Sequence, residues 1–241
     1  MTLQSPLPFL REMAKGFLHL GYPDLCVACS RELPAPDFCF CLKCRLKLHS
    51  SDMYKVSENE FTGRFWGRMP LAAGAAQYYF TRKSPIQWAL HQLKYKNNPD
   101  IGLKLGRLFG RQLAQAAPFQ SVEMIVPVPL HPKKERLRGY NQSTMFAKGL
   151  SEGWGGLPVC TDALARDLFT ESQTRKKRMD RFQNVGTVFT IRKPGLIEGK
   201  HVLLVDDVLT TGATLEMCGQ ALLQVAGVRL SMATIAIAMK E

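Results

Sequence analysis

The sequence predicts an α/β fold, a mostly parallel sheet with helices on both faces, with a small cysteine-rich module in front of it. The clearest observation is the apolar run Val202–Val205, which is typical of a strand buried on both faces of a parallel sheet. Apolar residues from Leu215 to Val225 then repeat with a helical period that stops at Gly227. A second buried strand is expected over Met124–Pro129.

The composition is that of an ordinary globular protein with a basic surface. The 241 residues are 46% hydrophobic and 22% charged, which excludes a disordered chain. The formal net charge is +12, and such an excess favours a polyanionic partner such as nucleic acid, or a phosphorylated substrate. A surface that is basic without such a partner is an equally good interpretation, since net charge does not specify function.

No stretch of the sequence resembles a membrane span, because none approaches the roughly eighteen apolar residues that a span needs. The amino-terminal segment Pro6–Leu20 is amphipathic, but Arg11, Glu12 and Lys15 interrupt it. A secretory signal would not contain these charges in its apolar region. We therefore expect a cytoplasmic protein without stable membrane insertion.

Five of the seven cysteines lie close together near the amino terminus: Cys26, Cys29, Cys39, Cys41 and Cys44. Two Cys-x-x-Cys pairs, 26/29 and 41/44, have the spacing of a tetrahedral zinc site, which lets a segment too small for its own core fold. Two disulfides are the alternative, but a reducing compartment disfavours them. Cys39 is the surplus thiol, and it could replace Cys41 as a ligand only by breaking the two-residue spacing.

The middle of the chain predicts a linker, a strand and two helices. Residues 47–68 are polar and are interpreted as a linker or a loose edge of the small module. A strand follows from Leu71, and helices are predicted over Ser84–Tyr95 and Pro99–Ala117. The junction Lys94–Asn98 could bind phosphate or stack a base. A solvated helix end is the favoured interpretation, because helix dipoles attract lysines there.

Four cations follow the second buried strand: Lys133, Lys134, Arg136 and Arg138. Pro127 and Pro129 mark the point where ladder pairing stops, since proline cannot donate to a sheet. In an open parallel sheet these cations then lie at the carboxyl edge, where ligands bind. They are therefore candidates to hold an anionic group.

The loop after the strand Val202–Val205 combines two carboxylates, Asp206 and Asp207, with the hydroxyl-rich segment Thr210-Thr211-Gly212-Ala213-Thr214. A glycine-containing loop that opens a helix points backbone N–H groups and the positive end of the helix dipole at a phosphate. Carboxylates cannot hold phosphate, but they accept hydrogen bonds from sugar hydroxyls, directly or through a divalent cation. The alternative is an ordinary turn whose polar residues cap the next helix.

This pattern resembles the loop of type I phosphoribosyltransferases that binds phosphoribosyl pyrophosphate (PRPP). The resemblance implies a type I phosphoribosyltransferase-like sheet, in which Asp206 and Asp207 hold the ribose 2′- and 3′-hydroxyls and residues 210–214 hold the 5′-phosphate. Magnesium would accompany PRPP, and Arg136 or Arg138 would face its pyrophosphate.

The motifs Val126-Pro127-Val128-Pro129-Leu130 and Arg138-Gly139-Tyr140-Asn141-Gln142, with the cysteine pairs in front and the PRPP loop behind, resemble the ComF family. That family, the competence protein F group, is associated with DNA uptake in natural transformation. The resemblance implies that residues 164–184 match a mobile loop over PRPP, with Gln173, Arg181 and Asn184 at its marked positions. The extension before Tyr22 and the extra Cys39 fall outside the family pattern. With a boundary placed where the sequence changes character near Phe61, we expect three parts: an amphipathic extension over 1–21, a zinc-ribbon module over 22–60 and a phosphoribosyltransferase-like domain over 61–241.

We therefore expect a PRPP-binding, phosphoribosyltransferase-like protein; if it turns over, the chemistry is magnesium-dependent pentosyl transfer. No acceptor pocket can be recognised in the sequence. The alternative is a non-enzymatic competence factor that binds single-stranded DNA on a degenerate phosphoribosyltransferase scaffold. The expected partners of the protein are PRPP or a related phosphorylated sugar, single-stranded DNA, and proteins of DNA uptake and recombination.

Overall fold

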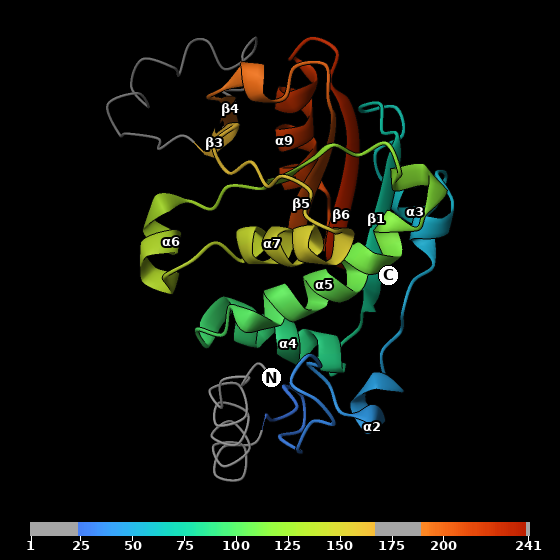
Figure 1. The fold of residues 1–241 in the computed structure, drawn as a ribbon, viewed down its shortest axis with the longest axis vertical. Helices are drawn as coiled ribbons and strands as arrows, with labels where there is room; N and C mark the ends of the chain where they lie inside the picture. Colours follow the sequence, from blue (N-terminus) through green and yellow to red (C-terminus); the bar gives the residue numbers. More distant parts are fainter. Residues whose placement is uncertain (1–23, 167–188, 240–241) are drawn as a thin grey trace, which may run out of the picture.

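The computed structural model describes residues 24–166 and 189–239 (Figure 1). In chain order the elements are α2 (Leu42–Arg45), η1 (Met53–Lys55), α3 (Glu60–Gly63), β1 (Ala73–Phe80), α4 (Pro85–Tyr95), α5 (Asp100–Ala114), η2 (Ala117–Phe119), β2 (Met124–Pro127), α6 (Pro132–Arg138), α7 (Gln142–Trp154), β3 (Leu164–Arg166), β4 (Phe189–Ile191), η3 (Pro194–Leu196), β5 (His201–Leu209), α9 (Ala213–Leu223) and β6 (Arg229–Ala238). The extension 1–21 and the loop positions Gln173, Arg181 and Asn184 lie outside the described residues. Among the residues described, no helix has the length and apolar character to cross a membrane.

The predicted parallel sheet is confirmed. Its order is β1-β6-β5-β2, and every neighbouring pair is parallel, so all four carboxyl ends meet at one edge. Strand β6 lies inside the sheet beside β5, with Asp206 opposite Thr234. Strands β3 and β4 form a separate antiparallel pair.

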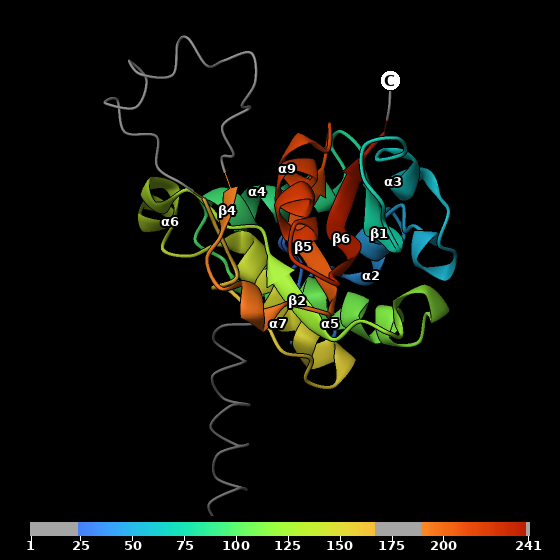
Figure 2. The same ribbon diagram turned by 90° about the horizontal axis from the view of Figure 1, so that it is seen from above.

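Helices cover both faces of this sheet (Figure 2). Helices α5 and α7 pack against each other and α7 rests on β2 and β5. Helix α9 contacts β5 and β6 from the opposite side, together with the segment that follows α3, where Arg68 forms an ion pair with Glu216 at 2.8 Å. The continuous apolar character of β5 and β6 is explained by this double coverage.

Helix α4 begins as the sequence predicts. The Ser84 hydroxyl accepts from the N–H of Gln87, and Pro85 occupies the first turn. Helix α5 is shorter than the predicted Pro99–Ala117, because the chain before Pro118 leaves the helical conformation and forms η2. Strand β2 likewise ends at Pro127 and not at Pro129.

The polar stretch 47–68 is folded onto the sheet and is not a loose linker. The Ser51 N–H donates to the carbonyl of Gln77 at 3.0 Å, and the Tyr79 N–H donates to the carbonyl of His49 at 2.8 Å. Phe61 and Phe65, both almost fully buried, anchor the segment in the core. The polar composition of the stretch concealed this packing, since aromatic rings bury a large area each and few are needed.

Helices α5 and α7 meet along a seam of glycines: Gly102, Gly106 and Gly110 on α5, and Gly149 and Gly153 on α7. A Cβ on Gly149 would overlap the main-chain carbonyl of Leu103, and one on Gly106 would lie 2.7 Å from the N of Leu150. The two backbones therefore touch directly. This contact fixes the position of α7, whose amino terminus points at the carboxyl edge of the sheet.

Replacing Gly149 by alanine is expected to lower the free energy of unfolding by about 1–3 kcal/mol, because the backbones cannot separate without disturbing the core. The control is Gly63→Ala, where a Cβ meets nothing within 4 Å; it should be neutral or stabilising by up to about 1 kcal/mol. Urea denaturation of both variants checks this. Equal stability of the two would show that the seam tolerates a methyl group.

Candidate functional site

Two neighbouring carboxylates end the buried part of β5 at the carboxyl edge of the sheet. Asp206 is half-buried, and its Oδ1 accepts from the Ser143 hydroxyl and from the N–H of Asp207, both at 2.8 Å. Ser143 is in place because Asn141 caps α7, accepting from the Ser143 N–H at 2.9 Å. The start of α7 therefore supports the first acid.

Burial and then the negative charge of Asp207 raise the pKa of Asp206 to about 7. The hydrogen bonds from Ser143 and from the Asp207 N–H, and the ammonium of Lys94, oppose this rise in pKa without cancelling it. In the free protein this carboxyl is therefore partly protonated near neutral pH. A ligand that prefers the carboxylate form would drive the proton off.

Asp207 is buried and only half satisfied. Its Oδ1 lies 2.9 Å from Nζ of Lys94, whereas its Oδ2 has no hydrogen-bond partner among the residues the structure describes. A buried carboxylate oxygen without a partner is costly. One acceptor at the end of β5 is therefore available to a ligand.

The loop after β5 has the geometry of an anion site. Gly212 adopts φ +86°, a conformation that favours glycine, and turns the chain directly into α9. Gly212 offers no side-chain cap, and the Ala213 N–H donates to the Thr211 hydroxyl at 3.4 Å. The start of α9, where N–H groups lack helical partners, lines a cavity of about 40 Å³. Residues 210–215 line this cavity together with Asp206.

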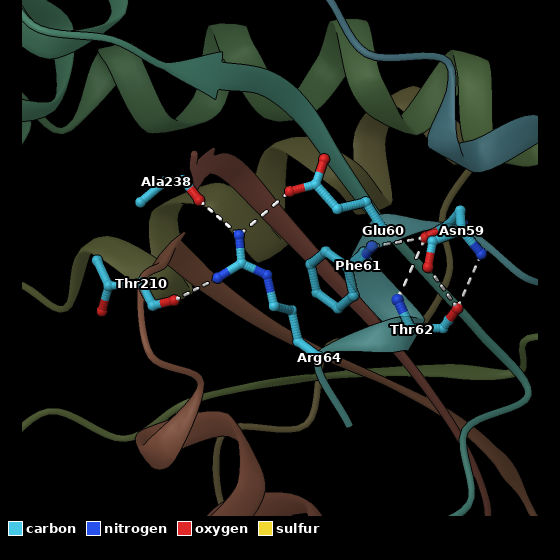
Figure 3. A network of polar contacts seen from close by, with 7 residues as sticks. All are labelled: Asn59, Glu60, Phe61, Thr62, Arg64, Thr210 and Ala238. Atoms are coloured by element: carbon cyan, nitrogen blue, oxygen red, sulfur yellow. Dashed lines mark hydrogen bonds and ion pairs between the residues drawn. The ribbon is translucent and has the colours of Figure 1, made fainter. Parts of the chain in front are cut away.

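Arg64 holds this loop against the end of the sheet, as Figure 3 shows. Its guanidinium donates to the carbonyl of Ala238 at 2.8 Å and to the carbonyl of Thr210 at 3.5 Å, and pairs with Glu60 at 3.1 Å. Its side chain is only 9% exposed. The carbonyl of Thr210 is thereby tied back, which leaves the N–H side of the loop open.

A larger cavity of about 230 Å³ adjoins the loop. Asp206 and Thr214 line both cavities. The remaining wall of the larger cavity consists of Lys94, Tyr95, Val128, Pro129, Leu130, Lys134, Arg138, Gln142, Ser143, Arg166 and Asp207. Acids and cations thus line one space, which adjoins the anion loop.

The structure brings together most, but not all, of the site residues that the sequence predicts. Asp206, Asp207, the loop 210–214 and Arg138 meet at the cavity, whereas Arg136 is exposed on α6 and is absent from its wall. The Arg138 guanidinium donates to Oε1 of Gln142 on α7, which also lines the cavity.

Sequence reasoning missed three residues of this wall: Lys94, Ser143 and Arg166. The favoured interpretation of the Lys94 junction, a solvated helix end, is wrong, since Lys94 pairs with Asp207 and the guanidinium of Arg138 lies 5.8 Å from the Tyr95 ring centroid. The signal available in the sequence was the basic and aromatic character of the junction Lys94–Asn98. Arg166, whose guanidinium lies 5.4 Å from the ring centroid of Phe189, belongs to the stretch 164–184 that the resemblance implies as a loop over PRPP, but it was not singled out there.

The cysteine pairs form a second candidate site. The sulfur atoms of Cys26, Cys29, Cys41 and Cys44 all lie within 4.8 Å of one another, as a metal centre requires. Although burial opposes ionisation of Cys26, N–H groups of Cys41, Ala28 and Cys29 lower its pKa to about 7. Cys39 is turned away, with its sulfur 4.0 Å from the carbonyl of Ile101, and burial raises its pKa to about 12. The four cysteines of the two Cys-x-x-Cys pairs are therefore the group that could hold a metal ion.

Comparisons with known proteins agree with this architecture. A family model described as the phosphoribosyl transferase domain matches residues 156–240. DNA utilization protein YhgH of Escherichia coli is 29% identical over 227 residues, covering 90% of this chain and 92% of that protein. Competence protein F of Haemophilus influenzae is 27% identical over 205 residues (83% and 85%), and competence protein ComFC of Bacillus subtilis is 28% identical over 145 residues (60% and 56%). The predicted resemblance to the ComF family and the phosphoribosyltransferase-type fold are confirmed.

Among solved structures, adenine phosphoribosyltransferase of Saccharomyces cerevisiae aligns with a TM-score of 0.38 at 18% identity, covering 81% of this chain and 86% of that one. Glutamine PRPP amidotransferase of Bacillus subtilis aligns with a TM-score of 0.41 at 20% identity, covering 59% of this chain and 30% of that one. At these scores the alignments add nothing to the topology described above.

The cysteine cluster is expected to hold one metal ion per chain. Cys29→Ser should lose this metal and lower the melting temperature, because binding energy of such sites is folding energy. Cys39→Ser is the matched control and should retain the metal. Inductively coupled plasma mass spectrometry of protein purified without chelator measures the metal content of both variants. Unchanged metal content in Cys29→Ser, or a metal-free wild type, would contradict the assignment.

Proposed function

This chain is a homologue of competence protein F and of DNA utilization protein YhgH with a phosphoribosyl transferase domain, and from that premise we propose that it binds PRPP and serves DNA uptake. The observation that carries the PRPP proposal is the pair of adjoining cavities at the carboxyl edge of the sheet. Paired acids, an anion loop and a cationic wall lie there within one ligand's reach.

In this proposal the ribose lies against the end of β5. Asp206 and Asp207 accept hydrogen bonds from the 2′- and 3′-hydroxyls, and the unpartnered Oδ2 of Asp207 is the acceptor best suited to this. A sugar hydroxyl there removes the cost of the unsatisfied oxygen. The half-protonated Asp206 becomes fully charged when a donor or a cation approaches it.

The 5′-phosphate would occupy the loop cavity. The N–H groups at the start of α9 and the hydroxyls of Thr210, Thr211 and Thr214 are its donors, and the helix dipole adds a favourable potential. Gly212 lets the backbone approach without a side chain, and Phe65 supports it from behind, since a Cβ on Gly212 would lie 3.2 Å from the Phe65 ring.

The pyrophosphate would face the cationic wall, where Arg138 and Lys134 line the larger cavity. The carboxylate oxygens of Asp206 and Asp207 are the hard donors that Mg²⁺ prefers, and the unpartnered Oδ2 fits such an ion. When bound, Mg²⁺ would offset the charge of the departing pyrophosphate. The residues themselves orient PRPP and stabilise the developing negative charge, so a strong general base is unnecessary.

We further propose that the metal of the cysteine cluster is zinc, on the basis of four thiolates with the spacing of a structural site. Cysteines that form no disulfide suit a reducing compartment, which supports a cytoplasmic location. The module over residues 22–60 would then depend on zinc for its fold, while residues 61–241 carry the sheet and the PRPP site.

A second candidate function, binding of single-stranded DNA, is favoured by an exposed aromatic face on α4. Trp88, His91 and Tyr95 are exposed at helical spacing, so they share one face, and the rings of His91 and Tyr95 lie 5.1 Å apart. Arg82, Lys83 and Lys96 flank this face and are exposed. Rings interleaved with cations are how proteins hold unpaired bases and their phosphates. Because Tyr95 also lines the larger cavity, such a strand would end at the proposed PRPP site.

PRPP binding is tested by calorimetric titration with PRPP and Mg²⁺. Wild-type protein should bind, and the double variant Asp206→Asn with Asp207→Asn should lose at least about a hundred-fold in affinity, because two hydrogen bonds to charged acceptors are weakened. Asp52→Asn, at an acid whose side chain is 74% exposed in a pair with Lys55, is the control and should bind normally. Absence of binding to the wild type, or equal binding to the double variant, would refute the proposal.

DNA binding is tested by fluorescence anisotropy with a labelled oligothymidylate. Trp88→Ala with Tyr95→Ala should weaken binding at least about ten-fold, because each stacked base contributes roughly 1–3 kcal/mol. The slope of affinity against salt should remain, since the cations are intact. Trp66→Ala, at a tryptophan that is 68% exposed elsewhere, is the control. If the double variant binds as tightly as Trp66→Ala, the α4 face does not bind DNA.

A further inference from the structure

Lys94 occupies a position between the two halves of the proposed PRPP site. It lies in the last turn of α4, its Nζ is 2.9 Å from Asp207 Oδ1, and its side chain is 27% exposed. It also lines the larger cavity, beside Lys134 and Arg138. The ammonium is thus shared between the acids at the end of β5 and the cationic wall.

This ion pair lacks the features of a purely structural one. A buried ion pair is stabilising only when hydrogen bonds satisfy its remaining oxygens, yet Asp207 Oδ2 has no partner within the described residues. The Lys94 side chain is also partly open to the cavity. The pair therefore holds charge at an incomplete site.

The main chain that carries Lys94 is fixed, while the end of its side chain is partly exposed at the cavity. Leu93 is fully buried, and its carbonyl accepts from the Tyr140 hydroxyl; the Lys96 N–H donates to the carbonyl of Gln92 at 2.9 Å. The four-carbon stem of lysine lets the ammonium turn by rotamer changes alone. A fixed stem next to a polyanion site is suited to a cation that changes partners.

We infer that Lys94 is a ligand-exchange cation: it neutralises Asp207 in the free protein and turns to the pyrophosphate of PRPP when the ribose hydroxyls reach Asp207. The inference rests on the proposed PRPP binding and deepens it by assigning a third cation to the pyrophosphate end. It also explains how two adjacent acids persist in the empty site without repelling the polyanionic ligand.

A merely structural role for Lys94 predicts a different result with part of the ligand. If Lys94 only kept Asp207 in place, its loss would weaken every ligand that uses the ribose diol, including ribose 5-phosphate. If it contacts pyrophosphate, its loss weakens PRPP and inorganic pyrophosphate and spares ribose 5-phosphate. Titrations with these three compounds therefore separate the two roles.

In the experiment, the full-length protein with its metal is titrated calorimetrically with PRPP, pyrophosphate and ribose 5-phosphate in the presence of Mg²⁺. Lys94→Met should lose at least about ten-fold in affinity for PRPP and for pyrophosphate, the range of one charge-assisted hydrogen bond. The affinity of Lys94→Met for ribose 5-phosphate should change by no more than about two-fold, because this variant loses only a cation that competes with the ribose for Asp207. Lys94→Arg should recover most of the PRPP affinity. Lys94→Gln is the second variant, should methionine disturb folding as judged by melting temperature.

Lys148→Met, at an exposed cation of α7 that lines neither cavity, is the control and should leave all three affinities unchanged. Unchanged PRPP affinity in Lys94→Met, or an equal loss for ribose 5-phosphate, would overturn the inference while the proposed function stands. Failure of the wild type to bind PRPP would overturn both.

Discussion

Two adjacent carboxylates at the end of a buried strand repel each other, and the arrangement of the site follows from the ways in which this repulsion is offset. Asp206 is offset by the Ser143 hydroxyl, by an N–H group and by a raised pKa. Asp207 is offset by Lys94 and retains one oxygen without a partner in the described structure. The end of β5 is therefore stable without a ligand, although one carboxylate oxygen lacks a hydrogen bond. A polyhydroxylated ligand that arrives with a cation gains most binding free energy at such a site.

Several segments that are distant in the sequence support the end of β5. The parallel order β1-β6-β5-β2 brings the loops after β2 and β5 to one edge, so cations and acids face each other across a cavity. The glycine seam between α5 and α7 fixes the amino terminus of α7 and with it Ser143. Arg64 ties the loop after β5 to the end of β6, which leaves the loop's N–H groups free for an anion.

The sequence allowed prediction of those features whose signals are local. The strand, loop and helix from His201 to Leu223, the Ser84 cap and the two cysteine pairs each depend on residues that are neighbours in the chain. The features missed depend on long-range contacts. Lys94 reads as a dipole-favoured helix end until the fold brings Asp207 to it, and Arg166 gains meaning only from the cavity that it lines. Residues 47–68 read as a linker because buried aromatic rings cannot be recognised from polar composition alone.

Asp206 at the end of β5 is held partly protonated until PRPP arrives, and this protonation is open to direct measurement. Calorimetry of PRPP binding in buffers of different ionisation enthalpy counts the protons exchanged. Because the pKa of Asp206 is about 7, wild-type protein near pH 7 should release about half a proton more per PRPP than Asp206→Asn measured at saturating ligand. An identical proton count in the two proteins would contradict the claim that this carboxyl meets the ligand.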